Sequence, residues 1–223
     1  MSIVNHQSQV PTLLYSGNIG IGQDIGTALR AVARLDGEAD LKVLIAGDGK
    51  GLAAVRVLVA ELRLAGAQIR PPVPLVRLGD LLAQGDIHLV CQQPGTEGLL
   101  VPSKIYSTLA AGRPSLFVGP AECEVGRIVC ESGSGFVVEP GDVERAAEVL
   151  GRLAAGAALR RGMGRNARAY YERHFGRDRS VRRIVAILES AADGRAGGER
   201  ACIRRGVRVG WRAWMNALDS AEG

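Results

Sequence analysis

The sequence predicts an α/β fold in which helices cover both faces of a doubly wound, mostly parallel sheet of about six strands. Short apolar runs alternate with longer stretches of helical spacing along most of the 223 residues. Runs such as KVLIA at 42–46 are largely apolar, as expected for strands buried on both faces. Right-handed connections between such parallel strands give a Rossmann-like sheet.

Turn residues bound each expected strand, and the strands are predicted at 13–16, 42–46, 67–70, 87–91, 115–118 and 135–138. Helical spacing predicts helices at 24–35, 52–65, 75–83, 103–111, 124–132, 143–153, 158–172 and 178–191. Asp24 is placed to cap the first of these helices, and Gly112 to end the fourth. We therefore predict a domain over 12–192, preceded by a lead over 1–11 and followed by a basic tail over 193–223.

The composition and the lengths of the apolar runs argue against several classes of protein. No apolar run reaches the roughly 18–20 residues of a membrane-spanning helix, and the polar N-terminus has no signal-peptide core. We therefore expect a cytoplasmic protein. Four cysteines and three histidines are scattered without metal-ligand spacing, so neither a metal site nor a disulfide framework is expected. His88 and Cys91 lie in one predicted strand and are interpreted as packed structural residues.

Basic residues gather near the C-terminus. Nine arginines lie between 160 and 183, against Glu172 and Asp178. They form either a solvated helical face or a contact with an anionic surface such as phospholipid, which would place the protein at the inner face of the membrane. The tail, with Trp211 and Trp214, is either disordered or amphipathic. Nucleic acid is not expected as a partner, because aromatic residues for base stacking are few.

A glycine-rich loop follows the first predicted strand. It carries Gly17, Asn18, Gly20 and Gly22, which let backbone approach a ligand closely. The spacing is neither the dinucleotide-binding G-x-G-x-x-G pattern nor a Walker A loop. Taken alone, the loop is either a tight turn or part of a ligand site.

A second unusual loop follows the fourth predicted strand. Glu97 lies on a glycine-flanked stretch before the helix that Ser103 opens, and Lys104 adds a positive charge there. A helix N-terminus with a lysine suits a pyrophosphate, and a carboxylate suits sugar hydroxyls. If the strand order is 3-2-1-4-5-6, both loops meet where the order reverses, which is where ligands bind in such sheets. The alternative is an ordinary loop carboxylate and a capping serine.

The run EGLLVPSKIYSTLAAGRP at 97–114 resembles the donor-binding segment of glycosyltransferase family 4 (GT-B, group 1). It is most similar to the branch found in capsule and exopolysaccharide synthesis. LYSGNIG at 14–20, LIAGDG at 44–49, DIHLV at 86–90 and YERHF at 171–175 match further landmarks in the family's order. The similarity covers about 13–190.

The resemblance implies the C-terminal, donor-binding half of a GT-B fold and transfer of a sugar from a nucleotide diphosphate sugar, a UDP-sugar by preference. It implies that Glu97 contacts the donor sugar. It also implies that Gly17, Asn18, Gly20 and the helix start hold the diphosphate; the helix-start residues are Gly98, Leu99, Leu100, Ser103 and Lys104. No cofactor or metal is implied.

Two departures from the family pattern affect nucleotide binding. Many members carry a ribose-binding glutamate where this chain has Ser107, and an arginine or lysine soon after the first loop, where this chain offers Asn18 and Gln23. Ser107 is therefore expected to hold ribose less strongly, and Lys104 to be the main phosphate-binding cation.

The expected function is the donor half of a glycosyltransferase acting on a glycan or lipid-linked acceptor. Such an enzyme uses two Rossmann-like domains, and only one is expected here, so a partner polypeptide is expected to supply the acceptor half. The alternative is a non-catalytic or degenerate nucleotide-sugar-binding module. A sugar-nucleotide epimerase is a third possibility, which the Pro-Ser-Lys segment disfavours.

Overall fold

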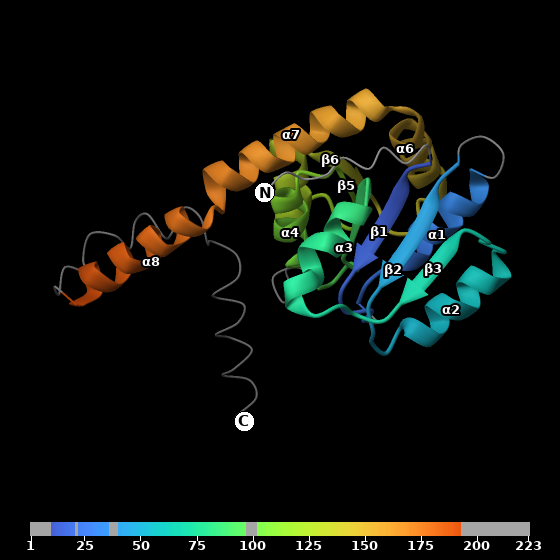
Figure 1. Ribbon diagram of the computed structural model, residues 1–223, viewed down its shortest axis with the longest axis horizontal. Coiled ribbons are helices and arrows are strands. Elements are labelled where there is room, and N and C mark those ends of the chain that lie inside the picture. The colour runs from blue at the N-terminus through green and yellow to red at the C-terminus, as the bar shows by residue number, and fades with distance from the viewer. Residues whose placement is uncertain (1–9, 21, 36–39, 97–101, 193–223) are drawn as a thin grey trace.

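The computed structural model describes residues 10–20, 22–35, 40–96 and 102–192. Strands and helices alternate along the chain, in the order β1 (Thr12–Ser16), α1 (Ile25–Arg34), β2 (Lys42–Ala46), α2 (Leu52–Glu61), β3 (Ala67–Arg70), η1 (Leu75–Arg77), α3 (Leu78–Gln84), β4 (Ile87–Cys91), α4 (Lys104–Ala111), β5 (Ser115–Val118), α5 (Glu124–Ser132), β6 (Gly135–Val138), α6 (Val143–Ala155), α7 (Ala157–His174) and α8 (Arg177–Ala192). Figure 1 shows the sheet at the centre with helices on both of its faces.

The sheet has the order β3-β2-β1-β4-β5-β6, and every pair of neighbours is parallel. This confirms the doubly wound fold and the predicted reversal of order between β1 and β4. The domain predicted over 12–192 contains all the described helices and strands. The tail over 193–223 lies outside the described residues.

Alternate residues of each strand point to opposite faces of the sheet and pack into separate hydrophobic cores there. On one face, Leu13, Tyr15 and Ile45 pack with residues of α1, α2 and α6. On the other face, α4, α5 and α7 pack over Val90 and Phe117. A smaller cluster joins α3 to Leu14, Leu44 and Ala46. The strands are therefore buried on both faces, as their apolar sequences indicate.

Two predicted helices differ from the structure. The helix expected over 52–65 ends at Glu61, because Arg63 adopts a left-handed backbone conformation with φ 52° that breaks the helix. The helix expected over 75–83 divides into η1 and α3 at Leu78. Asp24 caps α1 by accepting from the Thr27 amide, and Gly112 ends α4 in the left-handed conformation, both as predicted.

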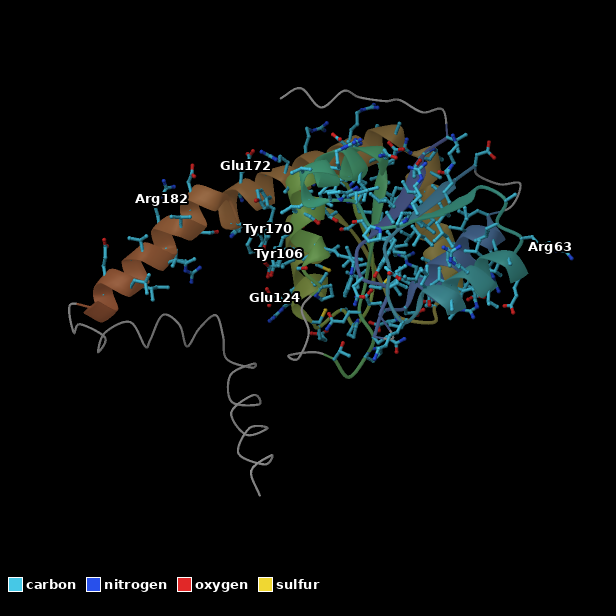
Figure 2. All side chains as sticks on the ribbon, turned by 60° about the horizontal axis from the view of Figure 1, so that its bottom comes forward. Arg63, Tyr106, Glu124, Tyr170, Glu172 and Arg182 are labelled. Carbon is cyan, nitrogen blue, oxygen red and sulfur yellow. The ribbon has the colours of Figure 1, made fainter. Side chains whose placement is uncertain are left out.

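α7 and α8 meet at an elbow anchored to the domain. The ring of Phe175, at the elbow, lies edge-on to Tyr106 of α4, with 4.8 Å between the ring centroids. The Tyr106 hydroxyl donates to Glu124 at 2.9 Å, and Tyr170 donates to Glu131. Figure 2 shows Tyr106, Tyr170 and Glu124 together beside α4, and Arg182 beyond them on α8.

His88 ties β4 to the helices that cover it. The side chain is 2% exposed; Nε2 lies 3.0 Å from the carbonyl oxygen of Leu82, and Nδ1 lies 3.2 Å from Thr108 Oγ1. Because a carbonyl only accepts, Nε2 carries the proton and Nδ1 accepts from Thr108. Burial lowers the pKa of His88 to about 4. The bond to Leu82 acts in the opposite direction and raises the pKa, and the charge of Arg113 adds a smaller lowering effect. His88 is thus a structural residue, as its place in the strand predicts.

We predict that His88 makes stability depend on pH. The unfolded chain binds a proton at His88 below about pH 6.5 and the folded chain only below about 4, so the free energy of unfolding falls as pH drops between these values. The full loss is on the order of 3 kcal/mol. Urea unfolding of wild type and His88→Asn between pH 7 and 4 tests this, with His174→Asn as the exposed control. An equal slope in His88→Asn and wild type contradicts the assignment.

Candidate functional site

The loops that follow β1 and β4 meet at the carboxyl edge of the sheet, where the strand order reverses. The Gln93 amide donates to the Gly22 carbonyl at 3.0 Å, and Lys104 Nζ donates to the Asn18 carbonyl at 3.4 Å. Both contacts join one loop to the other. The structure therefore brings Gly17, Asn18 and Lys104 together, as the sheet order predicts.

A second glycine loop, after β2, holds the first loop in place. The Gly17 amide donates to Ala46, the Ile19 amide to Asp48 and the Gly51 amide to Ile19, all at 2.8–2.9 Å. A Cβ atom at Gly47 would lie 1.9 Å from the Gly17 carbonyl oxygen. Glycine at position 47 therefore permits the two loops to nest. Gly17 itself has φ 117°, which only glycine adopts readily.

Lys104 is the cation of the site. Its Nζ lies 4.9 Å from the centroid of the Tyr15 ring, within cation–π range. Its Cε would be 3.0 Å from a Cβ at Gly17, so the lysine lies against the first loop. Burial lowers the pKa of Lys104, and Cys91 nearby acts in the opposite direction. The sequence indicated the charge of Lys104, but not Tyr15, which lies far away along the chain.

The two serines predicted for the site lie at the start of α4 and on its first turn. Ser103 occupies the N-cap position with a helical backbone conformation, and its side chain makes no capping bond. The amides of Ile105 and Tyr106 already donate to the carbonyls of Pro102 and Ser103, so these two amides are not free to bind an anion. The Ser107 hydroxyl donates to the Lys104 carbonyl at 2.9 Å. Lys104 therefore supplies much of the positive character of this helix start.

The predicted residues Glu97, Gly98, Leu99 and Leu100 lie outside the described residues. Gly20 is described and lies on the first loop, where a Cβ would be 3.2 Å from the side-chain nitrogen Nδ2 of Asn18. The described part of the site therefore consists of the first loop, the loop after β2 that supports it, and the start of α4.

A groove of about 1350 Å³ lies on a different part of the domain. It follows α3 and is lined by residues from the beginnings of β1 and β2, by β3, and by Ser107 and Tyr106 of α4. Gly17, Asn18 and Lys104 do not line it. Because ligands in parallel sheets bind at the carboxyl ends of strands, the switch point rather than this groove is the candidate ligand site.

The described cysteines show no metal-site geometry. Cys91 and Cys123 are buried and Cys130 is exposed. Burial raises the pKa of the Cys91 thiol, and the charge of Asp24 does so secondarily. Cys123 instead caps α5, its sulfur accepting from the Gly126 amide. Across the described ranges, no three potential metal-binding side chains gather, and no helix has the length and apolarity that a bilayer crossing requires.

The fold and the site define one doubly wound α/β domain with glycine-rich loops and a lysine at its switch point. A family model for glycosyl transferases group 1 matches residues 2–170, and the chain belongs to this family. This confirms the resemblance read from the sequence.

Two curated relatives are themselves described as glycosyltransferases. WcaI of Escherichia coli K12, named for colanic acid biosynthesis, is 36% identical over 59% of this chain and 32% of its own length. WbjE of Pseudomonas aeruginosa is 32% identical over 62% of this chain and 34% of its own length. The chain thus spans about a third of the length of these relatives.

Solved structures show the same fold. Sucrose-phosphate synthase from Thermosynechococcus elongatus superposes with a TM-score of 0.72 at 18% identity, covering 83% of this chain and 46% of that one. HepE of Anabaena, solved with UDP and glucose, gives 0.67 at 15% identity, over 80% and 48% of the two chains. The fold is that of one half of a GT-B glycosyltransferase, and the chain covers about half of each neighbour.

We predict that Gly47→Ala disrupts the nested loops. The new Cβ would meet the Gly17 carbonyl at 1.9 Å, so backbone must move, at a cost of about 1–3 kcal/mol in the free energy of unfolding. Gly66→Ala is the matched control, because nothing lies within 4 Å of its Cβ position. Urea unfolding measures both variants. Equal stability of the two would show that the loops do not nest in this way.

Proposed function

We propose that this chain is the donor-binding half of a glycosyltransferase that moves a sugar from a UDP-sugar to a glycan or lipid-linked acceptor. Family membership supports the reaction class. The observation that carries the proposal is the bridge from Lys104 to the Asn18 carbonyl, because it sets a cation between two loops at the switch point. A diphosphate needs such a cation beside closely approaching backbone.

In this proposal the diphosphate lies between the Gly17–Gly20 loop and Lys104. The first loop brings backbone close to the phosphates, and the lysine neutralises their charge. As the bond between the sugar's anomeric carbon and the diphosphate breaks, negative charge grows on the leaving oxygen, and a fixed cation stabilises it. The charge of Lys104 and the dipole of α4 supply this stabilisation without a bound metal.

The remaining contacts are proposed from the sequence. Glu97 contacts the hydroxyls of the donor sugar, and Gly98, Leu99 and Leu100 contribute amides to the diphosphate. The sequence also proposes Ser107 as an acceptor for the ribose, since a hydroxyl that donates to a carbonyl still keeps acceptor capacity. Ser107 lies on the first turn of α4 and lines the groove beside α3, so it is the least supported of these contacts. Ser103 lies at the helix start beside the phosphates.

We further propose that a partner polypeptide supplies the acceptor half. α8 supports this, because it continues beyond α7 away from the sheet (Figure 1). Val181, Ile184, Val185 and Leu188 follow helical spacing along one face, and Leu188 is 63% exposed. A helix with such a face is stabilised by packing against another surface.

The arginines of α7 suit a place at the inner face of a membrane. Arg161, Arg165 and Arg173 are exposed, and Arg168 is exposed but paired with Glu172. Exposed arginines attract anionic lipid headgroups, each contributing about 1 kcal/mol near the surface. We propose a cytoplasmic protein that contacts the membrane peripherally while a lipid-linked acceptor is used.

Lys104→Ala is expected to lower UDP affinity by tenfold to a hundredfold. A charge-assisted phosphate contact contributes roughly 1.5–3 kcal/mol, and this contact would be lost. Isothermal titration of UDP into wild type and Lys104→Ala measures the change, with Lys42→Ala as the control from the opposite end of the sheet. His88→Ala should lower stability while retaining affinity. Equal UDP affinity in the lysine variants would exclude Lys104 from the site.

The chain alone is expected to transfer no sugar. Catalysis needs donor and acceptor in contact with water excluded, and one half presents only the donor face. Release of UDP from a UDP-sugar should be measured with simple and lipid-linked acceptors, first with the chain alone and then with a candidate acceptor-half protein. Transfer by the chain alone would contradict the need for a partner. Inactivity with every acceptor half tested, despite UDP binding, would favour a non-catalytic module.

A further inference from the structure

Tyr15 is a buried residue of β1 whose ring and hydroxyl both face the site. It is 1% exposed, and it is the residue before the last of the strand. Its hydroxyl donates to the Asn18 carbonyl at 2.6 Å and also bonds the side-chain amide of Gln23. Burial raises the pKa of this hydroxyl, so it stays protonated and keeps donating. Packing of the strand core alone does not require this pair of bonds.

Lys104 reaches the same group of atoms from α4. Its ammonium lies 4.9 Å from the centroid of the Tyr15 ring and donates to the same Asn18 carbonyl that accepts from the Tyr15 hydroxyl. The side-chain amide of Gln23 satisfies both of its polar atoms when its oxygen and nitrogen are exchanged, and the oxygen then accepts from Lys104 Nζ at 3.3 Å. Three contacts from one tyrosine-centred group therefore surround the ammonium: a ring face, a carbonyl and an amide oxygen.

This arrangement fixes where the charge lies. A lysine side chain has four flexible carbons, and holding it costs rotamer entropy at the moment of binding unless the protein has already ordered it. Ring and carbonyl together limit the ammonium to the gap between the loops. An ordered cation contributes more to phosphate binding than a mobile one, because less freedom is lost on binding.

We propose that Tyr15 is a positioning residue for nucleotide binding: its ring and hydroxyl, with Gln23, hold the Lys104 ammonium at the point where the donor diphosphate binds. This inference rests on the proposed function, and it concerns the same site. Tyr15 itself does not touch the phosphates; it acts through Lys104. The same contacts explain how a chain with Gln23, rather than a basic residue, after its first loop retains a fixed cation.

The geometry is tested without nucleotide. The sequence contains only three lysines, Lys42, Lys50 and Lys104, so ¹³C-dimethylation gives a spectrum that Lys104→Ala assigns directly. The Lys104 methyl signal is expected at lower chemical shift than those of Lys42 and Lys50, because it lies over the Tyr15 ring. The displacement should persist in Tyr15→Phe and disappear in Tyr15→Leu. A Lys104 signal that coincides with those of the other lysines overturns the proposal.

The functional effect is tested on unmodified protein by UDP titration. Tyr15→Leu is expected to weaken UDP binding about twofold to thirtyfold, the range of a cation–π contact, and Tyr15→Phe less. In a Lys104→Ala background, Tyr15→Leu should cause no further loss. Leu14→Ala, from the same strand but packed against α3, is the control for a general loss of stability and should leave affinity unchanged.

The outcomes separate this inference from the proposed function. If wild type binds UDP and Tyr15→Leu binds it equally, or if the loss is the same with and without Lys104, the positioning role is wrong and the donor site stands. If wild type does not bind UDP, the proposed function fails and this inference with it. Should Tyr15→Leu not fold, Tyr15→Phe and the wild-type methyl spectrum still decide the matter.

Discussion

Strand β1 is the constraint on which the rest of the molecule depends. It pairs with β2 on one side and β4 on the other, and the chain winds away from it in opposite directions. No helix can cover the carboxyl ends of both strands at such a reversal, so their loops are left to face each other. The bond from Gln93 to Gly22 and the contact of Lys104 with Asn18 follow from that juxtaposition. The nested glycines at 17 and 47 belong to the other side of β1, where its loop meets the loop after β2.

Lys104 provides the positive charge at the point where the loops after β1 and β4 meet. The loop after β1 brings no basic side chain of its own, so a cation has to come from the other loop. Lys104 does this from the first position of α4, and its methylene chain lies against Gly17, where a larger residue would displace it. Its pKa is lowered by burial, yet a ring face and a carbonyl stabilise its charged form. The requirement for glycine and the placement of charge are therefore parts of one arrangement.

The sequence predicted most of the fold, because alternation and helical spacing are local signals. The strands at 42–46, 67–70, 87–91, 115–118 and 135–138 lie where the apolar runs indicated. The end of α2 was missed, since nothing in the sequence marks Arg63 for a left-handed conformation. In the site, the meeting of the two loops was predictable from strand order, but the contact between Tyr15 and Lys104 was not. That contact depends on how the long side chain of Lys104 reaches from α4 to the Tyr15 ring in β1, which no local sequence pattern encodes. The sequence also did not indicate that the amides of Ile105 and Tyr106 donate to the carbonyls of Pro102 and Ser103 at the start of α4.

A crystal structure of the chain grown with UDP tests the central claim most directly. The account predicts the diphosphate between the Gly17–Gly20 loop and Lys104, with the ammonium still over the Tyr15 ring and donating to a phosphate oxygen. Nucleotide bound in the groove beside α3, with Lys104 still on Asn18 and Tyr15, would contradict it.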